Sequence, residues 1–155
     1  AIAAYHLRGR LARPLRHLPP DGGSMKIALG LGCDRNTPTE TLRLALTAAL
    51  TISRTRIEDV VAVGSIDLKA DEPAMLELAA ERDWRIRFYP AAELAAVDVP
   101  NPSETVRKYT GTPSVSEAAA LLAAGADKSA LIIEKLSHRG PDGRNATVSI
   151  ARIPE

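Results

Sequence analysis

The feature that most constrains the fold of this chain is the alternation of short apolar runs with longer segments of helical period. From Met25 onward, runs rich in Val, Ile, Leu and Ala are separated by segments whose apolar residues recur at the spacing of one helix face. This alternation is typical of a layered α/β domain. We therefore predict a three-layer α/β/α domain over residues 25–155.

Five strands are predicted, over residues 26–31, 60–65, 85–89, 129–135 and 146–152. The second and fourth are apolar enough to lie at the centre of the sheet. A polar loop with two glycines joins the last two strands, which favours an antiparallel pair. We expect a mixed sheet of about five strands that ends in a C-terminal β-hairpin.

Capping sequences mark the predicted helices. Thr37–Glu40 and Asn101–Glu104 each place a polar N-cap before a proline and a glutamate, and Ser114–Glu117 forms a further capping box. Glycines predict the ends of the last two of these helices, at Gly111 and Gly125. The predicted helices run from Pro38 to about residue 52 and over 73–82, 91–97, 102–111 and 115–125.

Composition limits the partners. The single cysteine excludes an intrachain disulfide and a zinc-type cluster, and no metal site or cofactor is predicted. A net charge of +1 and 3% aromatic residues provide neither a basic field nor a stacking surface for nucleic acid. No apolar run approaches the ~20 residues of a membrane-spanning helix. We expect a cytoplasmic protein with no nucleic-acid or membrane partner.

Residues 1–24 differ from the rest of the chain. They carry four arginines against one acid, Asp21, and they end in the loop-like run Leu18–Ser24. We expect a leader outside the folded domain, which is a misassigned start, a vector remnant or a disordered segment. An organelle-targeting peptide is the alternative.

The turn after the first predicted strand carries the first candidate ligand-binding residues. Gly30 and Gly32 allow close approach of the backbone, and Cys33, Arg35 and Thr37 lead into a helix whose first N–H groups are free to bind an anion. A tight turn that needs glycine is the structural alternative. The helix start and Arg35 would lower the pKa of Cys33 and favour a nucleophilic thiolate, unless Cys33 is a small buried side chain.

The segment after the second strand gathers acids around one lysine. Lys69 opposes the dipole of the helix that follows, which a capping role does not require. It is a candidate for ligand binding or catalysis, with a solvated surface charge as the alternative. Glu72 precedes a proline and lies near the first turn of that helix. Glu72 is a candidate general base, with helix capping as the alternative.

Two later helix starts and one strand end supply the remaining candidates. Ser103 and Ser114 are predicted to cap helices whose N-termini line a ligand cleft. Glu117 is a second candidate general base, again with a capping role as the alternative. Lys135 closes an apolar strand and is predicted to add a positive charge to the site.

These strings together resemble the domain that CobE shares with the C-terminal half of CbiG. The matching strings, in order, are Gly-Leu-Gly-Cys-x-Arg at 30–35, Asp-Leu-Lys-Ala-Asp-Glu at 67–72, Pro-Ser-Glu at 102–104, Ser-Val-Ser-Glu-Ala-Ala-Ala at 114–120 and Lys135. The resemblance covers residues 25–153 and implies a three-layer α/β fold and a role in building the corrin ring of vitamin B12. The chain is most similar to the stand-alone CobE form.

Two functions follow as hypotheses. The chain binds a precorrin or a hydrogenobyrinic-acid-like tetrapyrrole as a carrier or chaperone, with other enzymes of the corrin pathway as further partners. Alternatively, it is an enzyme, a CbiG-like hydrolase of the ring lactone or an isomerase, with Glu72 or Glu117 as base and Lys69 or Arg35 stabilising negative charge. A phosphate-binding domain is least favoured, because the phosphate-loop spacing is missing.

Overall fold

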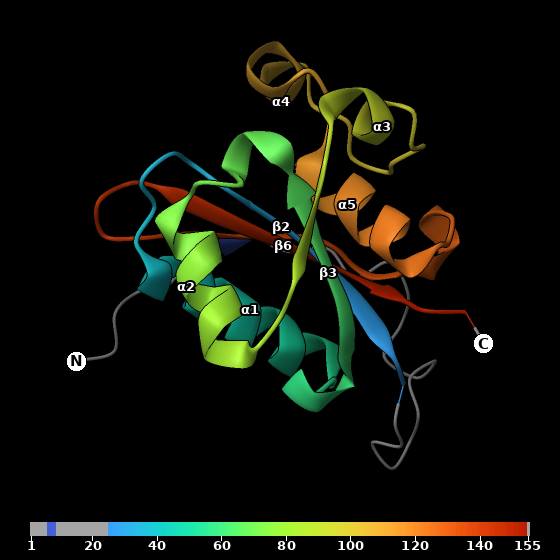
Figure 1. The fold of residues 1–155 in the computed structure, drawn as a ribbon, viewed down its shortest axis with the longest axis horizontal. Helices are drawn as coiled ribbons and strands as arrows, with labels where there is room; N and C mark the ends of the chain where they lie inside the picture. The colour runs from blue at the N-terminus through green and yellow to red at the C-terminus, as the bar shows by residue number, and fades with distance from the viewer. Residues whose placement is uncertain (1–5, 9–24, 155) are drawn as a thin grey trace.

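The computed structural model describes residues 6–8 and 25–154, which form one sheet with helices on both faces (Figure 1). The strands are β1 (His6–Arg8), β2 (Ile27–Cys33), β3 (Val60–Ile66), β4 (Ile86–Tyr89), β5 (Leu131–Arg139) and β6 (Asn145–Arg152). The α-helices are α1 (Thr39–Ser53), α2 (Pro73–Arg82), α3 (Ala91–Ala95), α4 (Glu104–Thr110) and α5 (Val115–Ala124). The predicted α/β/α architecture is confirmed.

The sheet has the strand order β1-β5-β6-β2-β3-β4. β2, β3 and β4 are parallel, whereas β5 and β6 form an antiparallel hairpin and β6 runs antiparallel to β2. The mixed sheet and the C-terminal hairpin are therefore confirmed. The second and fourth predicted strands, β3 and β5, are both interior strands with a neighbour on each side, and β6 and β2 lie between them.

A sixth strand joins the sheet at its edge. β1 pairs antiparallel with β5, with Leu7 opposite His138. The rest of the segment 1–24 lies outside the described residues, so the assignment of a leader stays a prediction. The predicted fourth strand ends at residue 135, whereas β5 extends to Arg139 and buries His138.

The alternating residues of β2 separate two cores. Its odd-numbered residues, such as Leu29 and Leu31, pack with α1 and α2 on one face of the sheet. On the other face Ala28 packs against α5. Figure 1 shows this three-layer arrangement, with α3 and α4 placed beyond the end of α5. Within the described ranges, none of the helices combines the length and apolar character needed to span a bilayer.

The contact of α5 with β2 depends on glycine. A Cβ atom at Gly30 would lie 1.8 Å from the carbonyl oxygen of Ser116 and 2.6 Å from the backbone nitrogen of Ala120. Its neighbour in the sheet, Gly64 of β3, faces Ala119 in the same way. The alanine-rich helix and the two glycines therefore allow the backbones to approach more closely than larger side chains permit.

The C-terminal ends of α4 and α5 lie where the sequence predicted them. Two of the predicted N-cap residues, Thr37 and Asn101, do not cap their helices. Gly111 and Gly125 end α4 and α5 in the left-handed conformation, with φ of 85° and 65°. Thr37 was expected to cap α1, but its hydroxyl donates to the carbonyl of Asp34 and the N-cap position is Pro38. The cap of α4 is Ser103 rather than Asn101, because Asn101 uses its side chain for contacts with other elements.

We expect Gly30→Ala to lower the free energy of unfolding by on the order of 3 kcal/mol, because the added methyl meets backbone atoms that cannot rotate away. Gly32→Ala is the matched control on the same strand and face, where a Cβ has no neighbour closer than 3.8 Å. Urea unfolding should show a loss of less than about 1 kcal/mol for that control. Equal losses in the two variants would contradict the close-packing role of Gly30.

Candidate functional site

A cavity of about 600 Å³ lies beyond the carboxyl ends of β2 and β3. This volume is within the range of small-molecule sites, and strand ends of this kind are where α/β proteins build them. Its walls come from the end of β2, the segment after β3, α4, the start of α5, β5 and β6. The lining residues are Gly32, Cys33, Asp34, Arg35, Ile66, Leu68, Lys69, Thr105, Val106, Tyr109, Thr110, Val115, Ser116, Lys135, Asn145 and Thr147.

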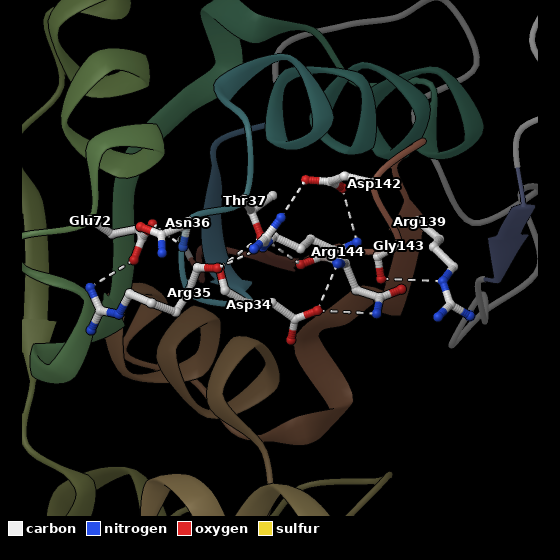
Figure 2. Close-up of polar contacts among 10 residues, drawn as sticks. Asp34, Arg35, Asn36, Thr37, Glu72, Arg139, Asp142, Gly143 and Arg144 are labelled. Atoms are coloured by element: carbon white, nitrogen blue, oxygen red, sulfur yellow. Dashed lines mark hydrogen bonds and ion pairs between the residues drawn. The ribbon is translucent and has the colours of Figure 1, made fainter.

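The loop from β2 to α1 is fastened to the hairpin loop between β5 and β6 (Figure 2). The Oδ2 atom of Asp34 accepts a hydrogen bond from the backbone N–H of Asn145 at 2.8 Å. Nε of Arg144 donates to the carbonyl oxygen of Arg35 at 3.1 Å, and the Thr37 hydroxyl donates to the carbonyl of Asp34 at 2.7 Å. These bonds hold the loop in one conformation beside the cavity.

Arg35 joins the same loop to the segment before α2. Its Nη1 lies 2.9 Å from Oδ1 of Asp71 and 2.7 Å from Oε2 of Glu72, and its Nη2 donates to the carbonyl of Leu68 at 2.7 Å. Glu72 is fully buried and accepts the N–H of Asn36 at 2.8 Å. The hydrogen bond to Asp71 raises the pKa of Arg35, and the same bond lowers the pKa of Asp71. The charge of Arg35 is therefore balanced by carboxylates of this chain.

Cys33 lines the cavity as a neutral thiol. Burial is the main cause that raises its pKa to about 11, and the positive charge of Lys69 only partly opposes that shift. This shift favours the small buried side chain over the nucleophilic thiolate, because desolvation outweighs the nearby positive charges. Within the described ranges, no group of three or more His, Cys, Asp or Glu side chains is arranged to hold a metal ion.

Lys69 and Lys135 bring positive charge to the cavity from two directions. Lys69 ends a short 3-10 turn after β3, and Lys135 lies in β5, with β2 and β6 between those two strands. Both side chains line the cavity and both residues are half-buried. Over residues 6–8 and 25–154, neither ammonium group lies within ion-pair distance of a carboxylate.

Glu117 lies in a separate buried cluster that fastens the segment before α4. It accepts hydrogen bonds from the Ser114 hydroxyl at 2.8 Å and from the Asn101 side-chain amide at 2.6 Å. The same amide donates to Glu134 of β5 at 3.0 Å. Ser103 caps α4 by accepting the N–H of Val106 at 3.2 Å. These contacts position α4 relative to α5 and β5.

Comparison with known proteins identifies the family. Residues 27–151 match the family model described as the cobalamin synthesis G C-terminus. The chain belongs to the CobE/CbiG C-terminal family. The resemblance inferred from the strings at 30–35, 67–72, 102–104 and 114–120 is thereby confirmed.

Relatives of this family domain differ in length. The cobalt-precorrin-5A hydrolase of Priestia megaterium is 36% identical over 128 residues, which cover 83% of this chain but only 32% of that protein. Protein CobE of a Sinorhizobium species is 40% identical over 112 residues, which cover 71% of this chain and 72% of CobE. The chain thus spans about a third of the hydrolase and most of CobE.

Solved structures of family members share the fold. The crystal structure of CobE, a protein from the cobalamin biosynthetic pathway, matches with a TM-score of 0.71 and 31% identity, over 90% of this chain and 97% of that one. Cobalamin biosynthesis protein chiG from Agrobacterium tumefaciens matches with a TM-score of 0.59 and 27% identity, over 83% of this chain and 99% of that one. The single-domain form of the family is therefore the closer counterpart in extent.

The cavity of this CobE/CbiG C-terminal domain brings together only part of the predicted site. Its lining includes Gly32, Cys33, Arg35, Lys69 and Lys135. The lining does not include Gly30, Thr37, Glu72, Ser103, Ser114 or Glu117. Gly30 lies beneath α5, and the other five make hydrogen bonds that hold the surrounding loops and helices. The functional roles assigned to the lining residues stay predictions.

The inner face of α4 was not predicted to be part of the site. Thr105, Val106, Tyr109 and Thr110 line the cavity from this helix, and Leu68 lines it from the segment after β3. One signal was available: the sequence Glu-Thr-Val-Arg-Lys-Tyr-Thr at 104–110 has no apolar stripe that a core could bury. A helix of that composition needs another reason for its position, and a ligand is one.

We expect Arg35→Ala to lower the melting temperature, because it leaves the buried carboxylate of Glu72 without a counter-charge. Adding Glu72→Gln should restore part of the loss, since glutamine keeps an acceptor for Asn36 and carries no charge. Arg43→Ala is the control, because Arg43 also pairs with two acids, Glu40 and Glu81, which are both exposed. Thermal unfolding that shows similar losses for both arginines would contradict this role of Arg35.

We expect Cys33 to react slowly with iodoacetamide at pH 7 and to titrate near pH 11, because the folded chain keeps the thiol protonated. The folded pKa is raised above the ordinary value of 9.0, so this group stabilises the fold below pH 9 and the contribution is lost as pH rises to about 11. Cys33→Ala should lack that loss in urea unfolding. Fast alkylation at pH 7 would show that the thiol is exposed.

Proposed function

We propose that this chain binds a carboxylate-rich corrin intermediate, a precorrin or hydrogenobyrinic-acid-like tetrapyrrole, as a carrier or chaperone. The observation that carries the proposal is the cavity of about 600 Å³, whose lining includes Lys69, Lys135 and several aliphatic side chains. A corrin intermediate has the matching chemistry, because carboxylates surround a large apolar ring. Membership in a cobalamin-synthesis family supports this class of ligand.

The two lysines are the part of the cavity that selects for acid groups. A half-buried ammonium without an ionic partner is partly desolvated, and a ligand carboxylate would replace the lost hydration with a charge-assisted hydrogen bond. Arg35 contributes less to ligand binding than the sequence suggested, because its guanidinium is engaged by Asp71 and Glu72. Lys69 and Lys135 are therefore the cations that a ligand would meet.

The apolar part of the cavity suits the ring. Four aliphatic side chains line it from the end of β3, the segment after β3, α4 and α5, namely Ile66, Leu68, Val106 and Val115. Burying a ring against such side chains stabilises the complex by roughly 25 cal/mol for each Å² of apolar surface removed from water. Selectivity then depends on the placement of the few polar groups at its edge.

Binding is favoured over turnover by the state of the candidate catalytic groups. Glu72 and Glu117 lie outside the cavity lining and accept hydrogen bonds from neighbouring residues, and Cys33 is a protonated thiol. The matched region covers only 32% of the hydrolase relative, so the match by itself does not assign the activity of that protein to this chain. A carrier would pass its ligand to other enzymes of the corrin pathway, which are the proposed partners.

We expect Lys69→Ala and Lys135→Ala each to weaken binding of hydrogenobyrinic acid by about tenfold, because each removes one charge-assisted hydrogen bond. Visible-absorbance titration of the full chain measures the affinity. Lys108→Ala is the control, since Lys108 is exposed on α4 and does not line the cavity. Added salt should weaken binding to the wild type more than to the two cavity variants.

The same titration distinguishes the proposal from catalysis. Gel filtration with retained colour and an unchanged ligand mass supports a carrier. A changed ligand mass would replace the proposal with an enzyme, the hydrolase or isomerase alternative. Equal affinities for the wild type and both lysine variants would show that the cavity is not the binding site.

A further inference from the structure

α4 does not pack into the hydrophobic core of the protein. None of its residues is buried, and its order rests on the Ser103 cap at one end and Gly111 at the other. A helix of 7 residues is marginal in water without packing partners. Packing in the hydrophobic core therefore does not explain the amino-acid sequence of α4 or its position in the fold.

The chain nevertheless holds α4 firmly at both ends. The backbone N–H of Ser103 donates to the carbonyl of Pro113 at 2.8 Å, which joins the two ends of the segment. The Asn101 amide donates to Glu117 of α5 and Glu134 of β5, at 2.6 and 3.0 Å. Figure 1 shows α4 projecting beyond α5 at the periphery of the fold. These contacts hold α4 beside the cavity, although the helix does not contribute to the core.

The face that α4 turns to the cavity carries an exposed aromatic ring. Val106 and Tyr109 lie on this face, and the Tyr109 residue is 79% exposed. On another wall of the same cavity Leu68 is 50% exposed. Only two further large hydrophobic residues are this exposed in the described part of the chain, Val61 and Leu76, and neither lines the cavity. Exposed apolar surface at a cavity mouth marks a place where a ligand covers it.

We propose that Tyr109, supported by Leu68, is the specificity-determining contact with the flat face of the ring. This inference rests on the proposed function and adds which part of the ligand is recognised. Lys69 and Lys135 attract carboxylates, but they do not distinguish one polycarboxylate ligand from another. The phenol ring of Tyr109 stacks in an offset geometry on a conjugated macrocycle. A flexible acid without a ring offers no surface for such stacking. Tyr109 therefore selects for ring shape, while Lys69 and Lys135 select for charge.

The test compares Tyr109→Ala with Tyr109→Phe in the full chain, using hydrogenobyrinic acid as the ring probe and citrate as a competitor without a ring. We expect Tyr109→Ala to weaken binding of the ring probe about tenfold, because it removes the stacking surface. Tyr109→Phe should stay within about twofold of the wild type, since the ring face is kept. Leu76→Ala is the control, because Leu76 is also 50% exposed but lies outside the cavity.

Two further measurements separate ligand contact from a structural role. The melting temperature of Tyr109→Ala without ligand should equal that of the wild type, since the side chain is exposed. Amide hydrogen exchange over residues 104–110 should slow when the ring probe binds to the wild type, because the helix then has a surface to pack on. The inhibition constant of citrate, corrected for the affinity of the ring probe, should be the same for the wild type and Tyr109→Ala.

The outcomes distinguish this inference from the proposed function. If Lys69→Ala weakens binding but Tyr109→Ala does not, the role of Tyr109 is wrong and the proposed function stands. If Tyr109→Phe loses as much affinity as Tyr109→Ala, the hydroxyl rather than the ring face makes the contact, and the inference is overturned. If the wild type retains no ring probe at all, both the proposed function and the role of Tyr109 are overturned.

Discussion

The close packing of α5 on β2 and β3 is the contact on which the rest of the structure depends. Gly30 and Gly64 lie side by side in the sheet and leave no side chain between their backbones and the alanine-rich helix. This approach places the start of α5, with Val115 and Ser116, at the carboxyl ends of the two strands. One wall of the cavity therefore exists because two positions on adjacent strands have no side chain.

The charged residues in and around the cavity differ in how their charges are balanced. Arg35 balances Asp71 and the buried Glu72, and Glu117 accepts hydrogen bonds from Ser114 and Asn101. These groups fasten the loops around the cavity. Lys69 and Lys135 carry charge that no carboxylate in the described ranges balances. A ligand that supplies carboxylates would balance this charge, which is the basis for our proposal that the site binds a corrin intermediate.

Local sequence predicted the elements well because their signals are local. The five strands of the domain, its five helices and the glycine C-caps at Gly111 and Gly125 agree with the structure within a few residues. Other predictions failed where the surroundings in the folded chain compete with the local signal. Thr37 donates its hydroxyl to the carbonyl of Asp34 in the adjoining loop instead of capping its helix, and burial reverses the pKa shift expected for Cys33. Sequence pattern alone shows neither the conformation of that loop nor the burial of the thiol.

The sequence by itself determined the α/β architecture, the family and the residue types that lie after β2 and β3. Each of these depends on periodicity, helix caps or motifs formed by residues that are close together in the sequence. Only the tertiary structure decided which of those residues share the cavity. In the structure Arg35 pairs with carboxylates of the protein, and Lys69 and Lys135 line the cavity without such partners in the described ranges. Tyr109 lines the cavity from α4, a helix of which only the N-terminus had been predicted to lie at the site. The physical reason is that burial, charge balance and exposure depend on neighbours that lie far away in sequence.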